Sequence, residues 1–285
     1  MIRTPGKAEK RTAEQLREHY EVERELAARL RNAPKQERRT LYASLYEELY
    51  RLVPHHSQIT RKISPEQQKA IVKKQVKVLE NLLDKNVSFL EVGPGDCSLA
   101  FEIAKSVKKV YAVDVSKTIT EASEIPPNFE LFLSDGCSIP VPKNSIDVIY
   151  SNQLMEHLHP DDAYDQLKNI FEALAPGGVY FCITPNRLNG PHDISRYFDT
   201  VATGFHLKEY TVGELSKLFK KVGFSKVILY IGAKGKYVRF PIFPAVFCER
   251  LLEPLPNSFR WKLAHSRLIG ALISIRLIGV KNDTS

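Results

Sequence analysis

In the middle of the chain, two acids (Glu91 and Asp114) and two glycines (Gly93 and Gly95) have the spacing of a nucleoside-binding site. An apolar run over residues 87–92 predicts a buried strand, and it ends in the turn Gly93-Pro94-Gly95. Glycines let such a turn approach a ligand closely, and the helix expected after it presents unpaired N–H groups. A second apolar run ends at Asp114, 21 residues after Gly93, which is the spacing at which a carboxylate receives a ribose diol.

Glu91 and Ser98 narrow the choice of nucleoside. A dinucleotide brings a doubly charged pyrophosphate to the glycine turn, and the acid at Glu91 would repel it. Ser98 stands where a dinucleotide motif has its third glycine, which allows close packing of helix on strand. S-adenosylmethionine has no phosphate, and its ammonium group is attracted to an acidic side chain. The residues therefore favour S-adenosylmethionine over a nicotinamide cofactor.

Further motifs follow in order, and with them the chain resembles the class I S-adenosylmethionine-dependent methyltransferases, in the small-molecule and O-methyltransferase branch. The motifs are Ser134-Asp135-Gly136, Ile146-Asp147-Val148-Ile149-Tyr150-Ser151-Asn152, Leu154-Met155-Glu156-His157-Leu158 and Leu174-Ala175-Pro176-Gly177-Gly178-Val179-Tyr180-Phe181. The resemblance covers residues 85–232. It implies an α/β fold with a Rossmann-like, doubly wound, seven-stranded and mostly parallel sheet.

The resemblance also assigns cofactor contacts by position. Asp114 would accept hydrogen bonds from the ribose hydroxyls, and Val115 would pack on the adenine or ribose. Asp135 would accept from the adenine amino group with the Gly136 backbone beside it, and Glu91 would face the methionine ammonium. The full set of expected cofactor-binding residues is Glu91, Gly93, Gly95, Asp114, Val115, Asp135, Gly136 and Asn152.

Glu156, His157 and His206 are the expected catalytic residues, because methyl transfer to a hydroxyl needs a base near the carboxyl ends of the strands. In ubiquinone-pathway and small-RNA 2′-O-methyltransferases, a Glu-x-x-Glu-His motif at this place holds a divalent metal. This chain has Gln153 in place of the first acid. An amide oxygen is a poorer ligand for a hard cation than a carboxylate, so we assign no metal ligand. The alternative role for Glu156 and His157 is to orient the loop.

Charge is spread unevenly along the chain. Residues 1–86 and 235–285 carry net charges of +7 and +5, and residues 87–234 carry −4. Basic flanks suit an anionic acceptor, a nucleic acid or an acidic membrane surface, although solvated helix faces produce the same pattern. The four cysteines lack the spacing of a zinc site, which indicates reduced thiols and a cytoplasmic protein. Neither a signal peptide nor a transmembrane segment is expected.

The elements needed around these motifs divide the chain into two parts. Residues 1–85 carry apolar residues at helical spacing and a stripe formed by Tyr42, Tyr46 and Tyr50, which predicts a helical extension that acts as a lid. Residues 86–285 predict the Rossmann-like methyltransferase domain. A proline-rich insertion over about residues 235–270 precedes its last strand near 275–281.

The predicted function is S-adenosylmethionine-dependent methylation of a hydroxyl on a small molecule, a glycan or a lipid-linked intermediate. An RNA methyltransferase and a non-catalytic S-adenosylmethionine-binding domain are the alternatives. The basic flanks suit RNA, but the tyrosine stripe falls on a regular helical face and no RNA-binding module is recognisable. Peripheral membrane contact through residues 236–276 also stays open, although their prolines argue against one long amphipathic helix.

Overall fold

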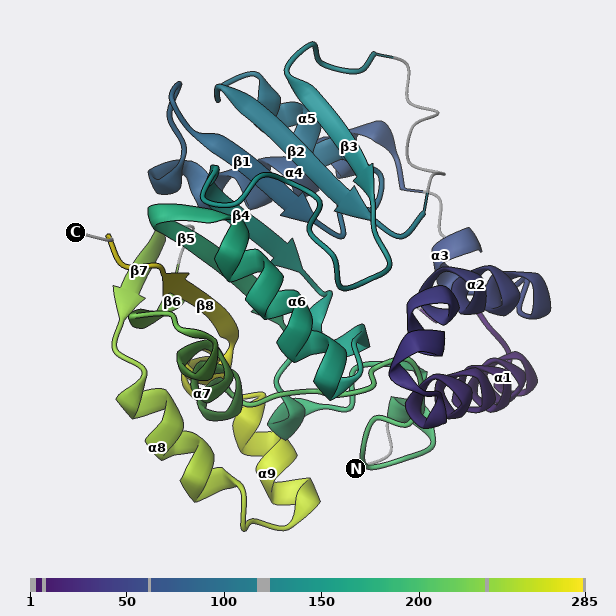
Figure 1. The fold of residues 1–285 in the computed structure, drawn as a ribbon. Helices are drawn as coiled ribbons and strands as arrows, with labels where there is room; N and C mark the ends of the chain where they lie inside the picture. Colours follow the sequence, from purple (N-terminus) through teal and green to yellow (C-terminus); the bar gives the residue numbers. More distant parts are fainter. Residues whose placement is uncertain (1–3, 7–8, 61–62, 117–123, 234–235, 284–285) are drawn as a thin grey trace.

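The computed structural model describes residues 4–6, 9–60, 63–116, 124–233 and 236–283, and its centre is one β-sheet (Figure 1). The strands are β1 (Ser88–Val92), β2 (Lys109–Asp114), β3 (Phe129–Leu133), β4 (Ile146–Asn152), β5 (Leu174–Thr184), β6 (Lys226–Ala233), β7 (Lys236–Phe240) and β8 (Ile275–Val280). Their order is β3-β2-β1-β4-β5-β8-β6-β7. β1 to β5 pair in parallel, whereas β8 is antiparallel to β5 and β6. The predicted Rossmann-like, mostly parallel α/β fold is confirmed.

The sheet has eight strands, where the sequence predicted seven. The additional strand is β7, which pairs with β6 as an antiparallel hairpin inside the expected insertion. The Tyr237 ring of β7 stacks on the Tyr230 ring of β6, with ring centroids 5.9 Å apart. Cross-strand aromatic pairs of this kind stabilise a hairpin, so part of the insertion extends the sheet. The alternation of strands and helices in the sequence also predicts a helix over residues 116–124, a segment that lies almost entirely outside the described residues.

Helices flank both faces of the sheet and continue beyond it. They are α1 (Ala13–Asn32), α2 (Lys35–Leu52), α3 (Ser57–Thr60), α4 (Pro65–Leu79), α5 (Ser98–Ala104), α6 (Pro160–Ala173), α7 (Val212–Val222), α8 (Phe243–Leu252), α9 (Asn257–Ala264) and α10 (Arg267–Ile273). Thr211 and Glu214 form a capping box at the start of α7, as their spacing predicts. None of the helices in the described part combines the length and apolarity needed to cross a membrane.

The alternation of side chains along β1 gives the sheet two buried faces. Phe89 packs in the cluster that includes residues of α4 and α5, whereas Leu90 and Val92 pack in the cluster that includes residues of α6 and α7. Because successive strand residues point to opposite faces, a fully apolar strand needs helices on both sides. The carboxyl ends of the parallel strands therefore stay free to border a cleft.

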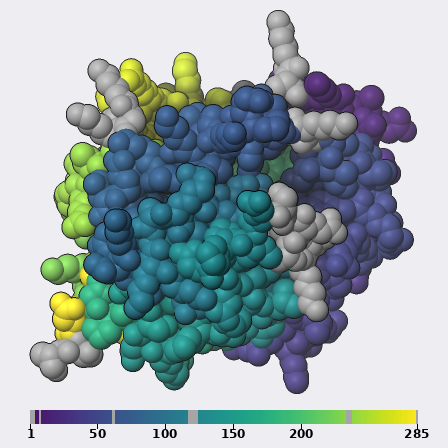
Figure 2. All heavy atoms as spheres, turned by 90° about the horizontal axis from the view of Figure 1, so that it is seen from above, coloured from purple at the N-terminus to yellow at the C-terminus, as the bar shows by residue number. Residues whose placement is uncertain are grey.

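α1 and α2 form the N-terminal side of the molecule, opposite the C-terminal residues (Figures 1 and 2). The Arg38 guanidinium of α2 forms two hydrogen bonds with the Asp162 carboxylate of α6, at 2.5 and 2.8 Å. The Tyr42 hydroxyl donates to the same carboxylate at 2.7 Å. Asp162 is fully buried, so this contact fixes the helical extension on the Rossmann-like domain.

Candidate functional site

A cavity of about 390 Å³ lies at the carboxyl ends of β1 and β2, beneath α2. Its floor comes from the sheet and its cover from the N-terminal helices. The lining residues from the sheet side include Val92, Gly93, Gly95, Asp114, Val115, Gly136 and Leu154, and those from the covering side include Tyr42, Tyr46, Tyr50 and Gln58. Five of the eight residues that the sequence assigns to the cofactor thus line one cavity.

The turn after β1 requires its glycines. Gly93 has φ of +71° and Gly95 of +58°, in the left-handed region that residues with a side chain rarely adopt. A Cβ added at Gly93 would lie 3.1 Å from the Leu154 side chain, whereas one at Gly95 would meet no protein atom within 4 Å. Gly95 therefore leaves open space where the cavity begins, which is what close approach of a ligand to the backbone needs.

Asp114 ends β2 at the wall of this cavity. One carboxylate oxygen accepts a hydrogen bond from the Ser116 N–H at 2.9 Å. Burial raises the pKa of Asp114, and hydrogen bonds from the backbone N–H groups of Ser116, Val115 and Gly95 partly oppose this shift. A half-buried carboxylate at this edge is suited to accept hydrogen bonds from a ribose diol.

Glu91 does not line the cavity but lies buried beneath the turn. Burial raises its pKa to about 8, and the negative charges of Asp96 and Asp114 add to this effect. Its Oε2 has no hydrogen-bond partner, although the side chain is only 5% exposed. A buried carboxyl oxygen without a donor is costly, and a cation or a proton satisfies it.

Asp135 and Asn152 also lie outside the cavity lining. Asp135 accepts the backbone N–H groups of Cys137 at 3.0 Å and Ser138 at 2.7 Å. Its other oxygen pairs with the Arg39 guanidinium at 3.2 Å. These contacts give Asp135 a turn-forming role, and Gly136 beside it lines the cavity.

A second, smaller cavity of about 190 Å³ adjoins the first. It lies between α1, the residues around α3 and the loops that follow β5. Its polar lining residues are Arg11, His19, Glu23, His56, Ser57, Gln58, His157, His192, Asp193, Arg196 and His206. Tyr46, Gln58 and His157 line both cavities, so the two meet at these side chains.

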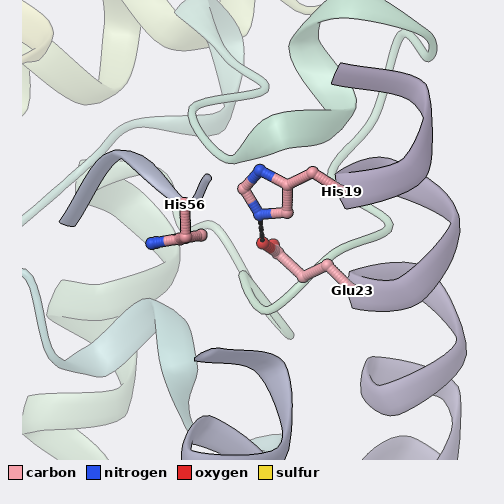
Figure 3. Close-up of side chains that lie close together, drawn as sticks. All are labelled: His19, Glu23 and His56. Carbon is pink, nitrogen blue, oxygen red and sulfur yellow. Dashed lines mark hydrogen bonds and ion pairs between the residues drawn. The ribbon is translucent and has the colours of Figure 1, made fainter. Parts of the chain in front are cut away.

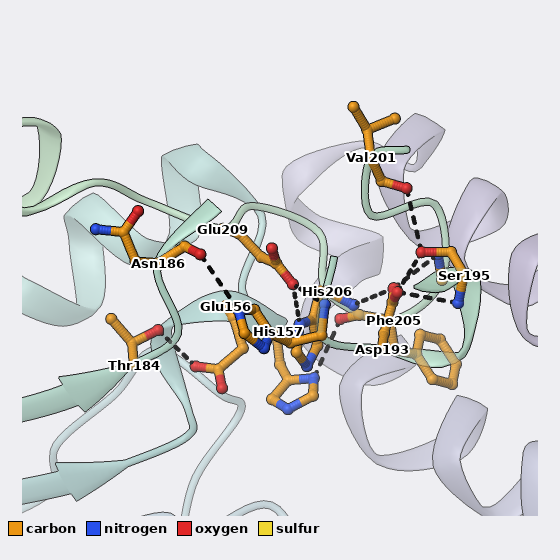
Figure 4. A network of polar contacts seen from close by, with 12 residues as sticks. Glu156, His157, Thr184, Asn186, Asp193, Ser195, Val201, Phe205, His206 and Glu209 are labelled. Atoms are coloured by element: carbon orange, nitrogen blue, oxygen red, sulfur yellow. Dashed lines mark hydrogen bonds and ion pairs between the residues drawn. The ribbon is translucent and has the colours of Figure 1, made fainter. Parts of the chain in front are cut away.

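The three predicted catalytic residues come together beside this junction (Figure 4). One ligand atom each of Glu156, His157 and His206 lies within 4.8 Å of the others. The imidazole rings of His157 and His206 are edge to face, with centroids 4.9 Å apart. Gln153, the residue that departs from the metal motif, is exposed.

Glu156 is the buried carboxyl group of the cluster. Its Oε2 accepts a hydrogen bond from the Thr184 hydroxyl at 2.8 Å, whereas its Oε1 has no partner. Burial raises the pKa of Glu156 to about 7, even though the positive charge on His206 favours the ionised form. The carboxyl therefore exchanges its proton near neutral pH.

His157 is held as a neutral imidazole with one nitrogen available. Its Nδ1 lies 3.1 Å from the Phe205 carbonyl oxygen and 2.9 Å from the Tyr46 hydroxyl. Because a carbonyl oxygen only accepts, the Nδ1 of the neutral ring carries the proton and Nε2 keeps its lone pair. Burial, followed by the charge of His206, lowers the pKa of His157 to about 3.

His206 has the opposite electrostatic environment. Burial alone would lower its pKa, but a hydrogen bond to Glu209 and the charge of Asp193 outweigh burial and raise it. The Nδ1 of His206 lies 2.7 Å from Glu209 Oε1. A carboxylate on Nδ1 fixes the ring orientation and makes the other ring nitrogen more basic.

The sequence analysis missed a second cluster, formed by His19, Glu23 and His56 (Figure 3). His19 Nε2 lies 2.7 Å from Glu23 Oε2, and the Arg11 guanidinium lies 2.7 Å from His19 Nδ1. Since a guanidinium only donates, Nδ1 is the acceptor and the proton on Nε2 is donated to Glu23. His19 then has no lone pair left for a metal ion. The spacing of His19 and Glu23 on one helix face was a visible signal, but nothing in the sequence links them to His56.

Glu23 connects this second cluster to the catalytic one. Its Oε1 accepts the Phe205 N–H at 2.9 Å, and the carbonyl oxygen of the same residue receives the Nδ1 proton of His157. α1 thereby holds the peptide that orients His157. The same helix donates three hydrogen bonds from Arg31, to the carbonyl oxygens of Thr203 and Gly204, each at 2.8 Å, and of His206 at 3.2 Å.

Comparison with known proteins identifies the family. Residues 55–229 match the family model of a methyltransferase domain. A probable S-adenosylmethionine-dependent methyltransferase of Mycolicibacterium smegmatis is 31% identical over 136 residues, which cover 47% of this chain and 51% of that protein. A tRNA N(3)-cytidine methyltransferase of Mus musculus is 28% identical over 158 residues, covering 48% of this chain and 41% of that protein. The chain thus spans about half the length of the curated relatives it matches.

Solved structures share the fold at low sequence identity. A phosphoethanolamine N-methyltransferase of Haemonchus contortus, solved with phosphoethanolamine and S-adenosylhomocysteine, aligns with a TM-score of 0.53 and 14% identity. The alignment covers 87% of this chain and 50% of that one. This likeness shows the fold, whereas the family match and the mycobacterial relative confirm the predicted class I family and its cofactor, S-adenosylmethionine. The chain belongs to the class I S-adenosylmethionine-dependent methyltransferases.

Proposed function

We propose that this protein is a cytoplasmic S-adenosylmethionine-dependent methyltransferase that acts on a hydroxyl group bound in the smaller cavity. The observation that carries the proposal is the junction of the two cavities at Tyr46, Gln58 and His157. A cofactor held over the glycine turn and an acceptor held among the histidines would meet there. The polar lining of the smaller cavity suits a hydroxylated small molecule, or the sugar part of a glycan or lipid-linked intermediate.

S-adenosylmethionine supplies a methyl group that its sulfonium already activates, so the protein has to align the reactants and remove a proton. The acceptor oxygen forms the new bond to the methyl carbon while the carbon–sulfur bond breaks and its electron pair stays on sulfur. We assign the hydroxyl proton to Nε2 of His206 in its neutral form, in which the Nδ1–H is held by Glu209 and the lone pair on Nε2 is the acceptor; Glu209 raises the basicity of that ring. The pKa of His157, about 3, makes this ring a hydrogen-bonding contact rather than the base.

A divalent metal ion is the second candidate for activating the hydroxyl. The observation that favours it is the buried, unpartnered Oε1 of Glu156 beside two imidazoles. A backbone carbonyl holds His157 and a carboxylate holds His206, which is the usual outer support of metal-binding histidines. Glu156, His157 and His206 would hold the ion, and it would lower the pKa of a bound hydroxyl. The sequence analysis assigned no metal ligand, and a metal-binding measurement tests that assignment directly.

Two binding experiments test the proposed function. Calorimetry with S-adenosylmethionine and S-adenosylhomocysteine, with a nicotinamide dinucleotide as control, should show binding of the first two only. Repeating it with Mg²⁺ and with Mn²⁺, alone and with cofactor, separates the two routes to hydroxyl activation. A heat of metal binding that is lost in Glu156→Gln would establish the metal route.

Turnover separates an enzyme from a non-catalytic binding domain. Release of S-adenosylhomocysteine should be followed with panels of hydroxylated small molecules, glycans and lipid-linked sugars. The tRNA-modifying relative makes RNA the competing acceptor class, and a salt series distinguishes it. A steep loss of acceptor affinity with salt would indicate contacts with nucleic acid phosphates and contradict the small-acceptor proposal. Cofactor binding without turnover on any panel would indicate a binding domain.

A further inference from the structure

The helices between β7 and β8 present apolar side chains to solvent. On α8, Phe243, Phe247 and Leu251 recur every fourth residue and are 74%, 53% and 58% exposed. Ala245, Glu249 and Leu252 form the opposite, buried face of the same helix. Figure 1 shows α8 and α9 at the outer edge of the molecule, beyond β6 and α7. The stripe therefore faces away from the core instead of completing it.

The two neighbouring helices also expose apolar side chains. Phe259 on α9 is 53% exposed, and Leu268 on α10 is 84% exposed. α8, α9 and α10 pack against one another, so these side chains belong to one helical subassembly. None of the five apolar residues lines either of the two cavities. Isolated exposed apolar residues are ordinary, but a stripe on one helix, together with exposed apolar residues on the two helices packed against it, marks a contact surface.

Residues 236–280, which include these helices, carry a net positive charge, and both of their acidic side chains are engaged in other contacts. Arg239, Arg250, Lys262 and Arg267 are all exposed. Glu249 and Glu253 are the acidic residues between positions 236 and 280. Glu249 is buried and accepts the N–H groups of Val212 at 2.6 Å and Gly213 at 2.9 Å. Glu253 forms an ion pair with Arg187.

We propose that α8, α9 and α10 dock the protein on an anionic lipid bilayer. Phenyl and leucyl side chains would enter the boundary between headgroups and acyl chains, and the arginine and lysine side chains would contact anionic headgroups. Proline breaks the segment into short helices, so the apolar groups are presented by packed helices instead of one long amphipathic helix. This inference does not depend on which acceptor is methylated.

Sedimentation with lipid vesicles tests the proposal on the full chain. We expect at least about tenfold more protein bound to phosphatidylcholine vesicles containing phosphatidylserine than to pure phosphatidylcholine vesicles, with the difference lost at high salt. Phe243→Glu with Phe247→Glu should abolish binding, whereas Ile71→Glu, at an exposed apolar position of α4, should not. Arg250→Glu with Lys262→Glu should reduce binding, and Lys73→Glu on α4 should not.

Retained binding of S-adenosylmethionine in each variant shows that the variant is folded. The proposal is overturned if the wild-type protein ignores both kinds of vesicle, or if the α4 and α8 variants bind alike. It is also overturned if analytical ultracentrifugation shows a dimer that Phe243→Glu dissociates, because a second copy of the chain would then cover the surface. Failure of methyl transfer would leave this result unaffected.

Discussion

The two cavities are built in different ways, although they share one wall. The larger cavity is formed mainly by short segments that follow β1, β2 and β3, and its shape depends on backbone conformation at Gly93 and Gly95. The smaller cavity is formed by side chains from α1, from the residues around α3 and from the loops that follow β5. For example, the hydrogen bond from the Phe205 N–H to the Glu23 carboxylate joins two residues that lie 182 positions apart in the sequence.

This difference separates the proposed cofactor site, whose floor the sheet provides, from the proposed acceptor site, which α1 and the residues around α3 complete. Parallel strands place their carboxyl ends at one edge in any protein of this fold, so a nucleoside site there needs few special residues. The polar acceptor cavity needs long-range hydrogen bonds between elements that have no reason to meet in other members of the fold. Substitutions in the larger cavity should therefore change cofactor binding, whereas substitutions in the smaller cavity should change turnover.

The largest expected effect is on the chemical step. His206→Ala should lower turnover about a hundredfold or more, because it removes the base, and should leave the affinity for S-adenosylmethionine unchanged. Glu209→Gln should give a smaller loss and shift the pH profile of turnover. Steady-state kinetics with calorimetry measure both, and His265→Ala, at an exposed histidine directly after α9, is the control. An unchanged rate in His206→Ala would exclude it as the base.

The next effect is on cofactor binding. Asp114→Ala should weaken S-adenosylmethionine binding by about 1.5–3 kcal/mol, the contribution of hydrogen bonds to a charged group. Turnover at saturating cofactor should change much less, since Asp114 belongs to the larger cavity only. Calorimetry compares this variant with Asp84→Ala, an exposed acid before β1. Equal affinities would refute the assigned ribose contact.

A smaller effect tests the connection from α1 to the catalytic loop. Glu23→Ala leaves the Phe205 N–H without its acceptor and loosens the carbonyl that orients His157. We expect kcat/KM to fall about tenfold, with cofactor affinity retained. Glu21→Ala, on the exposed face of α1, should behave as the wild type. Loss of cofactor binding in Glu23→Ala would show that α1 supports both cavities.

The last prediction concerns stability and not binding or turnover: the free energy of unfolding should depend on pH through Glu91, which lies beneath the glycine turn. Burial raises the pKa of Glu91 to about 8, above the ordinary 4.5 of the unfolded chain, so the folded state keeps a proton that the unfolded state has lost. The free energy of unfolding should therefore fall as pH rises from about 4.5 to about 8, and stay low above that. Urea unfolding of Glu91→Gln across this range should show a weaker decline. If the free energy of unfolding falls equally with pH in the wild type and in Glu91→Gln, another titrating group causes the pH dependence.

The helical extension contributes to both cavities, which revises the simple picture of a lid over the acceptor. Tyr42 packs against Gly136, where an added Cβ would lie 2.8 Å from the tyrosine ring, and its hydroxyl bonds Asp162. Tyr46 lines both cavities, and its hydroxyl lies 2.9 Å from His157 Nδ1. The tyrosine stripe visible in the sequence thus combines packing with a place in the site.

The sequence by itself determined the sheet, the glycine turn and the position of Asp114, because these depend on short-range patterns of apolar residues, glycines and acids. It also named Glu156, His157 and His206, which follow from the order of motifs. Only the tertiary structure decided which of these groups is neutral, charged or unpartnered, since burial and long-range hydrogen bonds set their pKa values. The sequence could not reveal the cluster of His19, Glu23 and His56, because these residues come together through helix packing and not through their spacing along the chain.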